Sequence, residues 1–450
     1  MGDILNVTMS RFDVWKTKIT PALVLFVVLS VALVGVGLVT STSPSFTAVG
    51  NAAESSPGAF VQEAYTTIQN NFWRDIGDQR LNTLFARGVE KITPQSSVNI
   101  TSKEQIGSLV NTQYTSMNKQ KRKKFPARLV NLVLQTLPPE GRSRVYTQEK
   151  EEKLSNRVNN VNPDKNLYQI LGVAENASLK EIANVYKDKK QKLSQKDQST
   201  STKRKQSRIE YAGRVLSDAQ YRKQYDSTGS EPTVFVERLT DDIVHLRIYK
   251  YNKRTLKEFQ KAVTSIELGS NPPSSMIIDL RSNVGGAVGV LPYLLGPFIG
   301  PDRPAYEFIQ QGSTTPYRTK TGWINELVPY KKVVILVDKK TQSTGELMAS
   351  VLKKYNVGVV VGERTRGWGT IERVFELENQ YRADREYSLF LVHHLTLRGD
   401  GKPIQNNGVV PEVRTEKDGW QQQLYNYIPH DPLVRQVENV WNTIPLGTQM

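Results

Sequence analysis

The stretch from Ala22 to Val39 constrains this 450-residue chain more than any other part, because it contains no charged residue. At about 1.5 Å of rise per residue, a helix over Ile19–Val39 is long enough to cross the ~30 Å hydrocarbon core of a membrane. Apolar side chains would cover every face of that helix, whereas a helix on a globular core keeps a polar stripe. The sequence therefore predicts a transmembrane helix over residues 19–40, preceded by a cytoplasmic N-terminus over residues 1–18.

The cations that flank this helix predict its orientation. Arg11, Lys16 and Lys18 precede it, and no Lys or Arg follows until Arg74. The positive-inside rule then places the bulk of the chain outside the cell membrane, as a single-pass protein. A cleaved signal peptide is the alternative, although the apolar core is longer than the usual ~7–15 residues of such a peptide. Residues 41–57, rich in Ser, Thr, Ala and Gly, are expected to form a flexible tether.

Composition excludes several kinds of site. The chain has no Cys, which rules out disulfides, thiolate metal ligands and a Cys nucleophile. With only four His, it offers no histidine-rich metal site, so neither a metal nor a cofactor is predicted.

Two basic runs, at residues 119–128 and 187–208, supply much of the net charge of +16. Solvated helix faces are the simpler interpretation of such runs, and contact with anionic lipid or an anionic envelope polymer is the alternative. No nucleic acid partner is predicted, because no aromatic side chains are interleaved with the cations.

The spacing of apolar residues changes along the part of the chain that follows the predicted tether. Residues 58–160 are expected to be helical, because apolar residues recur at helical spacing from Phe60 to Val89. Residues 161–230 form a second helical unit, with helices expected at 179–193 and 203–216. Residues 417–450 are expected to be a C-terminal helical extension.

Residues 231–416 instead predict an α/β domain, because short apolar runs alternate with helical segments. Helices are expected at 255–265 and 346–355. The expected strands are 234–238, 243–249, 275–280, 333–337 and 357–361.

Three motifs in this α/β part carry a resemblance to a known family. The first is Asp279-Leu280-Arg281-Ser282-Asn283-Val284-Gly285-Gly286, the second is Ser343-Thr344-Gly345-Glu346, and the third runs from Val359 to Thr370. In this order they resemble the carboxyl-terminal processing, or tail-specific, serine proteases. The resemblance covers residues 60–157 and 233–413 and implies a crotonase-like α/β core.

The resemblance assigns candidate roles to several residues. It implies that Ser343 occupies the nucleophile position and that Gly285, Gly286 and Thr344 are candidates for the oxyanion hole. A Ser between a strand and a helix exposes its hydroxyl beside free backbone N–H groups, and paired glycines let a backbone approach a ligand. From the local sequence alone, an ordinary helix N-cap is the favoured interpretation of Ser343.

The chain departs from the family at the catalytic base. Trp368 stands where the family has its Lys, and Glu372 stands where it usually has a Gln. An indole N–H only donates, so Trp368 cannot accept a proton. Without a base, serine attack typically slows by ~10²–10⁴-fold. Glu372 with a raised pKa, or His393 and His394, remain alternative bases.

Residues 166–229 resemble a J domain, in the place where the family normally carries a peptide-binding PDZ domain. Leu167-Tyr168-Gln169-Ile170-Leu171-Gly172-Val173 matches the opening of that domain. Its His-Pro-Asp tripeptide, expected near Ser194-Gln195-Lys196, is absent, so no ATPase chaperone is predicted as a partner. The insert is then either a docking module or a spacer.

Together these features predict a membrane-anchored, extracytoplasmic serine-type peptidase. If active, it would cleave peptide bonds near the C-terminal tails of proteins. The alternative is a pseudoenzyme that binds peptide as an adaptor without hydrolysis. A membrane co-chaperone is disfavoured by the missing tripeptide and by the predicted topology.

Overall fold

The computed structural model describes residues 55–94, 98–194, 199–266 and 271–446. The predicted membrane helix over 19–40, the N-terminus over 1–18 and nearly all of the tether lie outside these residues. Within the described ranges, no helix has the length and apolar character needed to cross a bilayer.

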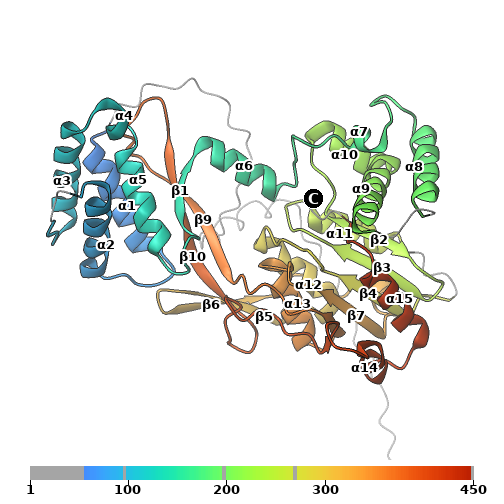
Figure 1. Ribbon diagram of the computed structural model, residues 1–450. Helices are drawn as coiled ribbons and strands as arrows, with labels where there is room; N and C mark the ends of the chain where they lie inside the picture. The colour runs from blue at the N-terminus through green and yellow to red at the C-terminus, as the bar shows by residue number, and fades with distance from the viewer. Residues whose placement is uncertain (1–54, 95–97, 195–198, 267–270, 447–450) are drawn as a thin grey trace, which may run out of the picture. The chain divides into compact units, whose positions relative to one another are not determined.

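A six-stranded sheet forms the centre of the α/β part, with strand order β11-β8-β7-β4-β3-β2 (Figure 1). All neighbouring strands are parallel except β2 and β3, which are antiparallel. The predicted strands are confirmed, with ends shifted by at most two residues. Their bounds are β2 Val234–Arg238, β3 Ile243–Ile248, β4 Ser275–Asp279, β7 Lys332–Val337 and β8 Val359–Gly362; the sixth strand, β11 Val413–Arg414, was not predicted.

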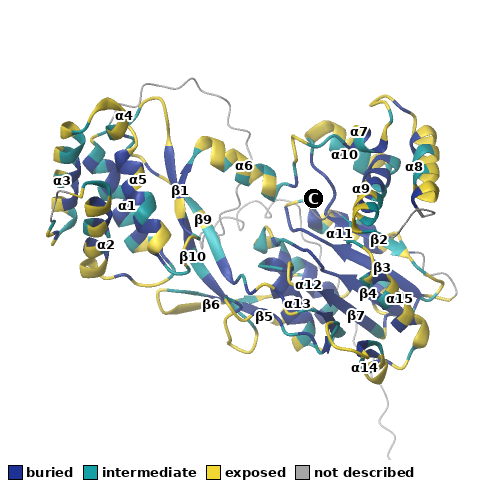
Figure 2. Cartoon of the chain, viewed as in Figure 1, coloured by how far each residue is buried: buried dark blue, intermediate teal, exposed yellow. Residues whose placement is uncertain are grey.

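Helices cover both faces of this sheet, and alternate strand residues divide between them. On β4, Ile278 joins the core that contains residues of α11, α12 and α13, whereas Ile277 joins the core that contains α14 and α15. Figure 2 shows the central strands as buried, which is expected of parallel strands covered on two sides. The helices are α11 Thr255–Thr264, α12 Leu291–Ile299, α13 Thr344–Lys354, α14 Trp420–Tyr427 and α15 Asp431–Trp441, with short 3₁₀ turns at Val288–Val290 and Asn325–Leu327.

A second, five-stranded antiparallel sheet was not predicted as a sheet. Its order is β1-β10-β5-β6, and β9 also pairs with β10. His393 and His394, named above as alternative bases, both lie on β10. The strands are β1 Arg144–Thr147, β5 Pro304–Gln310, β6 Ser313–Arg318, β9 Thr370–Glu376 and β10 Tyr387–Leu397.

The predicted N-terminal helices pack on this second sheet. Phe60 and Ile68 share one buried core with Leu389 and Leu391 of β10. The N-terminal segment therefore depends for its core on residues near the other end of the chain. The helices are α1 Pro57–Asn71, α2 Asp78–Ile92, α3 Lys103–Ser116, α4 Lys119–Arg122 and α5 Phe125–Thr136.

The J-domain-like part shares a core with the edge of the six-stranded sheet. Tyr211 lies 5.6 Å from Phe235 of β2 and 6.5 Å from Tyr249, measured between ring centroids. Arg214 also pairs with Glu237 of β2. The insert therefore covers an edge strand that would otherwise expose unpaired backbone groups. Its helices, and the one that leads into it, are α6 Gln148–Val158, α7 Leu167–Leu171, α8 Leu179–Ser194, α9 Thr200–Ser217 and α10 Ala219–Thr228.

Candidate active site around Ser343

Ser343 lies at the N-terminus of α13, in the connection that follows β7. Its φ of 54° and ψ of −123° place a non-glycine residue in a region that L-residues rarely adopt. Such a conformation costs about 1–3 kcal/mol and persists only where the surroundings impose it. The turn therefore holds the backbone of Ser343 in one specific, strained conformation.

The paired glycines after β4 lie directly beside Ser343. A Cβ built on Gly285 would lie 2.7 Å from the Cβ of Ser343, so only glycine permits this approach. A Cβ on Gly286 would lie 2.0 Å from the carbonyl oxygen of Tyr251, and the φ of Gly286 is 133°. The fold thus brings together two motifs that are widely separated in the sequence.

Two backbone N–H groups at this position have no hydrogen-bond partner within the described part of the chain, namely those of Gly286 and Thr344. The N–H of Gly285 instead donates to Asn283 Oδ1 at 2.8 Å, so it is not free to bind an oxyanion. Thr344 Oγ1 donates to the carbonyl of Gly286 at 3.0 Å. That bond ties together the two residues whose N–H groups are free.

The buried carboxylate of Glu346 joins this turn to the loop that carries residue 368. Its Oε2 accepts from the N–H groups of Ser343 at 2.9 Å and Trp368 at 2.8 Å. Its Oε1 accepts from Thr365 Oγ1 at 2.5 Å and from the N–H of Gly367 at 2.6 Å. Burial raises the pKa of Glu346, against the opposing effect of these donors. The sequence pointed to Glu346 only as part of a motif and did not predict this central position.

The indole of Trp368, the residue at the position where the resemblance expects a lysine, contacts two charged side chains. Its Nε1 donates to Glu372 Oε1 at 3.3 Å, and the same oxygen accepts from Thr370 Oγ1 at 2.6 Å. The guanidinium of Arg142 lies 3.1 Å from the centroid of the indole ring, a cation–π contact. Burial raises the pKa of Glu372 and lowers that of Arg142. Sequence reasoning missed Arg142, which lies in the turn before β1.

The two histidines considered as alternative bases make their contacts elsewhere. His393 Nδ1 lies 2.8 Å from the carbonyl oxygen of Asn71 and 2.7 Å from Gln310 Nε2. His394 lies 5.5 Å from Phe308, between ring centroids, and burial lowers its pKa to about 4. Neither forms a hydrogen bond to Ser343 in the ranges that the structure covers. Those ranges also contain no group of His, Asp and Glu that could hold a metal ion.

Comparison with known proteins gives two domain matches. The profile of peptidase family S41 matches residues 242–415, and the DnaJ domain profile matches residues 166–226. The carboxy-terminal processing protease CtpA of Bacillus subtilis is 28% identical over 185 residues, which is 41% of this chain and 37% of that protein. The chloroplastic C-terminal processing peptidase of Tetradesmus obliquus is 30% identical over 141 residues, which is 30% of this chain and 28% of that protein. The chain thus covers less than half of the length of the curated relatives that it matches.

Solved structures of related fold cover more of the chain at low similarity. The photosystem II D1 C-terminal processing protease aligns with a TM-score of 0.45 and 13% identity, over 80% of this chain and 93% of that one. A lipoprotein from Streptococcus agalactiae aligns with a TM-score of 0.42 and 14% identity, over 83% of this chain and 96% of that one. Residues 242–415 are thus similar to peptidase family S41, and residues 166–226 are similar to the DnaJ domain.

Proposed function

We propose that this protein binds extended peptide beside Ser343 and that its hydrolysis of that peptide is impaired by at least ~10²-fold for lack of a base. The observation that carries the proposal is the indole N–H of Trp368, which donates to Glu372 at 3.3 Å and cannot accept a proton, at the sequence position where the resemblance expects the lysine base. The free N–H groups of Gly286 and Thr344 support the binding part, because such donors hold a carbonyl oxygen as well as an oxyanion.

The surroundings of Trp368 offer no substitute base in the position of the missing lysine. Arg142, on the face of the indole, and Arg366, 5.1 Å from it, stay protonated. Burial raises the pKa of Glu372, but its Oε1 accepts from Trp368 and Thr370, and among the described residues no hydrogen bond joins this carboxylate to Ser343. Proton removal from Ser343 therefore has no positioned acceptor among these groups.

Peptide tails are the ligands that the named relatives favour, since both are carboxy-terminal processing enzymes. A protein of this kind that does not cut would act as an adaptor for C-terminal tails. The constrained conformation of Ser343 and the close approach of both glycines support an ordered peptide-binding geometry at this turn.

The test restores the base and asks whether Ser343 becomes reactive. A lysine alone at position 368 would face Glu372 and be held protonated by it, so the variant is Trp368→Lys combined with Glu372→Gln. We expect labelling by a fluorophosphonate probe to rise by ~10²-fold or more over the parent, and to vanish when Ser343→Ala is added. Strong labelling of the parent at Ser343 would refute the proposed impairment. Failure of the double variant to gain labelling would show that the missing lysine does not limit the site.

We further propose that residues 19–40 anchor the protein in the cell membrane, with the S41 domain outside. The uncharged run from Ala22 to Val39 and the preceding Arg11, Lys16 and Lys18 support this topology. The protein should stay in the membrane pellet after alkaline carbonate extraction and should be digested by protease added to spheroplasts. Release by carbonate, or protection from the protease, would contradict the anchor or its orientation.

A further inference from the structure

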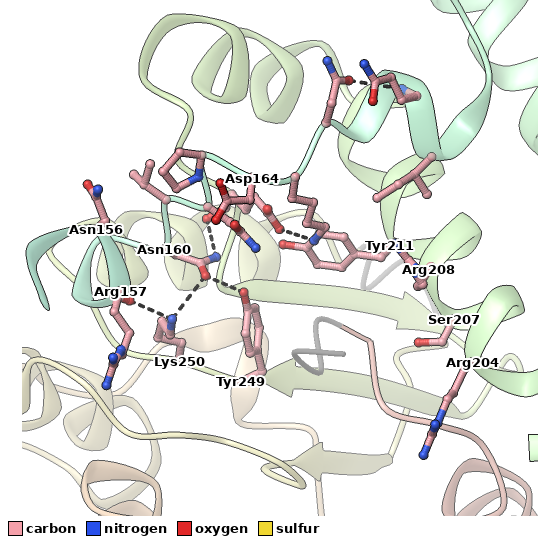
Figure 3. Close-up of a pocket in the computed structure, with 18 of the residues that line it drawn as sticks. Asn156, Arg157, Asn160, Asp164, Arg204, Ser207, Arg208, Tyr211, Tyr249 and Lys250 are labelled. Carbon is pink, nitrogen blue, oxygen red and sulfur yellow. Dashed lines mark hydrogen bonds and ion pairs between the residues drawn. The ribbon is translucent and has the colours of Figure 1, made fainter. Parts of the chain in front are cut away.

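A large cavity lies between the S41 domain and the DnaJ domain, away from Ser343. It has a volume of about 1460 Å³ and is lined from α6, from the segment that follows it, from α9 and from the end of β3 (Figure 3). Small-molecule sites usually measure ~300–1,000 Å³. The cavity is therefore large enough for a segment of polypeptide.

Cations without carboxylate partners line both sides of the cavity. Arg157 on α6, and Arg204, Lys205 and Arg208 on α9, form no ion pair with any residue that the structure describes. Figure 3 shows Arg157 on the opposite side of the cavity from Arg204. The facing sides thus present positive charge to whatever lies between them.

Lys250, at the end of β3, adds a buried cation. Its Nζ donates to the carbonyl of Arg157 at 2.7 Å and to Asn160 Oδ1 at 3.3 Å, and to no carboxylate among the described residues. Burial lowers the pKa of Lys250 to about 8, which still leaves it mostly charged at neutral pH. The neighbouring Glu231 is neutralised by Lys165, with 2.8 Å between Oε2 and Nζ. The charge of Lys250 therefore has no paired countercharge.

Two buried hydroxyl groups in the lining lack hydrogen-bond partners. Ser207 is 5% exposed and Tyr211 is 2% exposed, and neither hydroxyl oxygen has a partner in the described part of the chain. Leaving a buried hydroxyl unpaired costs free energy, so such groups usually face a ligand or ordered water. Both hydroxyls line the same cavity as the unpaired cations.

The remaining lining favours peptide over a phosphate polymer. The side-chain amides of Asn156, Asn162 and Gln169 make no hydrogen bond among the described residues, and such amides both donate to and accept from a peptide backbone. Glu152 and Asp164 also line the cavity, so a ligand must place uncharged groups beside them and its anionic groups beside the arginines, which a polymer with a phosphate at every unit cannot do. A peptide can place its own carboxylates against the arginines and its amide groups against these side chains.

We propose that this cavity binds an acidic peptide segment, with carboxylates held by Arg204 and Arg208 and by Lys250. The lining residue Tyr249 accepts at its carbonyl from the N–H of Val284 at 3.3 Å, so the cavity wall is hydrogen-bonded to the loop that carries Gly285. The inference does not depend on hydrolysis, since Ser343 does not line the cavity.

The test measures binding of a short fluorescein-labelled peptide of alternating Glu and Ser to the full-length protein, by fluorescence anisotropy. We expect the double variant Arg204→Ala with Arg208→Ala to weaken binding about tenfold, through loss of two charge contacts. The matched control is Lys187→Ala with Lys192→Ala, which removes equal charge from exposed residues of α8 that do not line the cavity. The control should bind the peptide as the parent does.

Three results would overturn the proposal. They are equal weakening by the control pair, equally tight binding of the peptide with Gln in place of Glu, and full displacement of the peptide by a single-stranded oligothymidylate at equal concentration. Weakening by the control pair would show that binding depends on the overall positive charge and not on the cavity. Tight binding of the Gln peptide would show that the carboxylates of the peptide are not recognised, and displacement by the oligonucleotide would indicate a nucleic acid site. Because Arg204 and Arg208 are exposed, a folded double variant is expected, and its circular dichroism spectrum should match that of the parent.

Discussion

Replacing Glu346 by Gln tests whether one carboxylate holds the turn of Ser343 to the loop of Trp368. Each carboxylate oxygen accepts two hydrogen bonds: Oε1 from Thr365 and Gly367, and Oε2 from Ser343 and Trp368. In the amide, one oxygen becomes an NH₂ group, so two donors lose their acceptor and face another donor. At about 1.5–3 kcal/mol for each hydrogen bond to a charged group, the loss is about 3–6 kcal/mol.

The expected net effect lies at the lower end of that range. Burial of the Glu346 charge has its own cost, as the raised pKa of this carboxyl indicates, and the neutral amide relieves that cost. We therefore expect the free energy of unfolding to fall by ~3 kcal/mol. The assay is urea unfolding followed by tryptophan fluorescence, in which the midpoint should fall while the slope stays constant.

The matched control is Glu363→Gln, which removes a more exposed carboxylate of the same domain. Glu363 pairs with Lys339 at 3.7 Å, and the lysine side chain is 74% exposed. A surface pair of this kind contributes little, so the control should stay within ~0.5 kcal/mol of the parent. If Glu346→Gln unfolded with the parent's free energy, the carboxylate would not be what holds the two loops together.

Two further predictions concern the glycine turn and a buried histidine. Gly286→Ala should lower the free energy of unfolding by about 1–3 kcal/mol and abolish peptide binding beside Ser343, because the new Cβ would lie 2.0 Å from the carbonyl oxygen of Tyr251. The control is Gly289→Ala, whose Cβ would have no atom within 4 Å, and it should change neither the stability nor the binding. Burial alone would lower the pKa of His245, but hydrogen bonds to the carboxylates of Asp279 and Glu237 raise the pKa above 6.5. A raised histidine pKa stabilises the fold fully below ~6.5 and less as the pH rises through the folded-state value. In urea unfolding, the free energy of unfolding of the parent should therefore fall as the pH rises above ~6.5, and that of His245→Gln should not. Identical pH profiles for the two proteins would contradict this prediction.

Much of the α/β core could be predicted from sequence because its signals are local. The short apolar runs that form β4 and β7 identify strands without knowledge of their partners. The helix predicted to begin at Glu346 begins at Thr344 instead, because the N-cap is Ser343. A difference of this size is expected where a cap rather than periodicity decides the boundary.

The second sheet could not be predicted because its pairings are not local. β1 pairs with β10, with Val145 opposite Leu389, and no pattern within β1 specifies a partner so distant in the sequence. For the same reason, the basic runs of the sequence did not reveal the cavity between α6 and α9. Of the two basic runs, only the one over residues 187–208 contributes to the cavity, whereas Arg157 and Lys250 line it from other parts of the chain.

The sequence by itself determined the strands β2, β3, β4, β7 and β8 with the helices α11 and α13, the place of Ser343 before a helix and the absence of a lysine at position 368, because these depend on residue type and spacing alone. Only the tertiary structure decided that Gly285 touches Ser343, that Glu346 joins two loops and that Arg142 covers the ring of Trp368. Those contacts join segments that are far apart in the chain. Their geometry follows from how the two sheets pack with their helices, which no local pattern encodes.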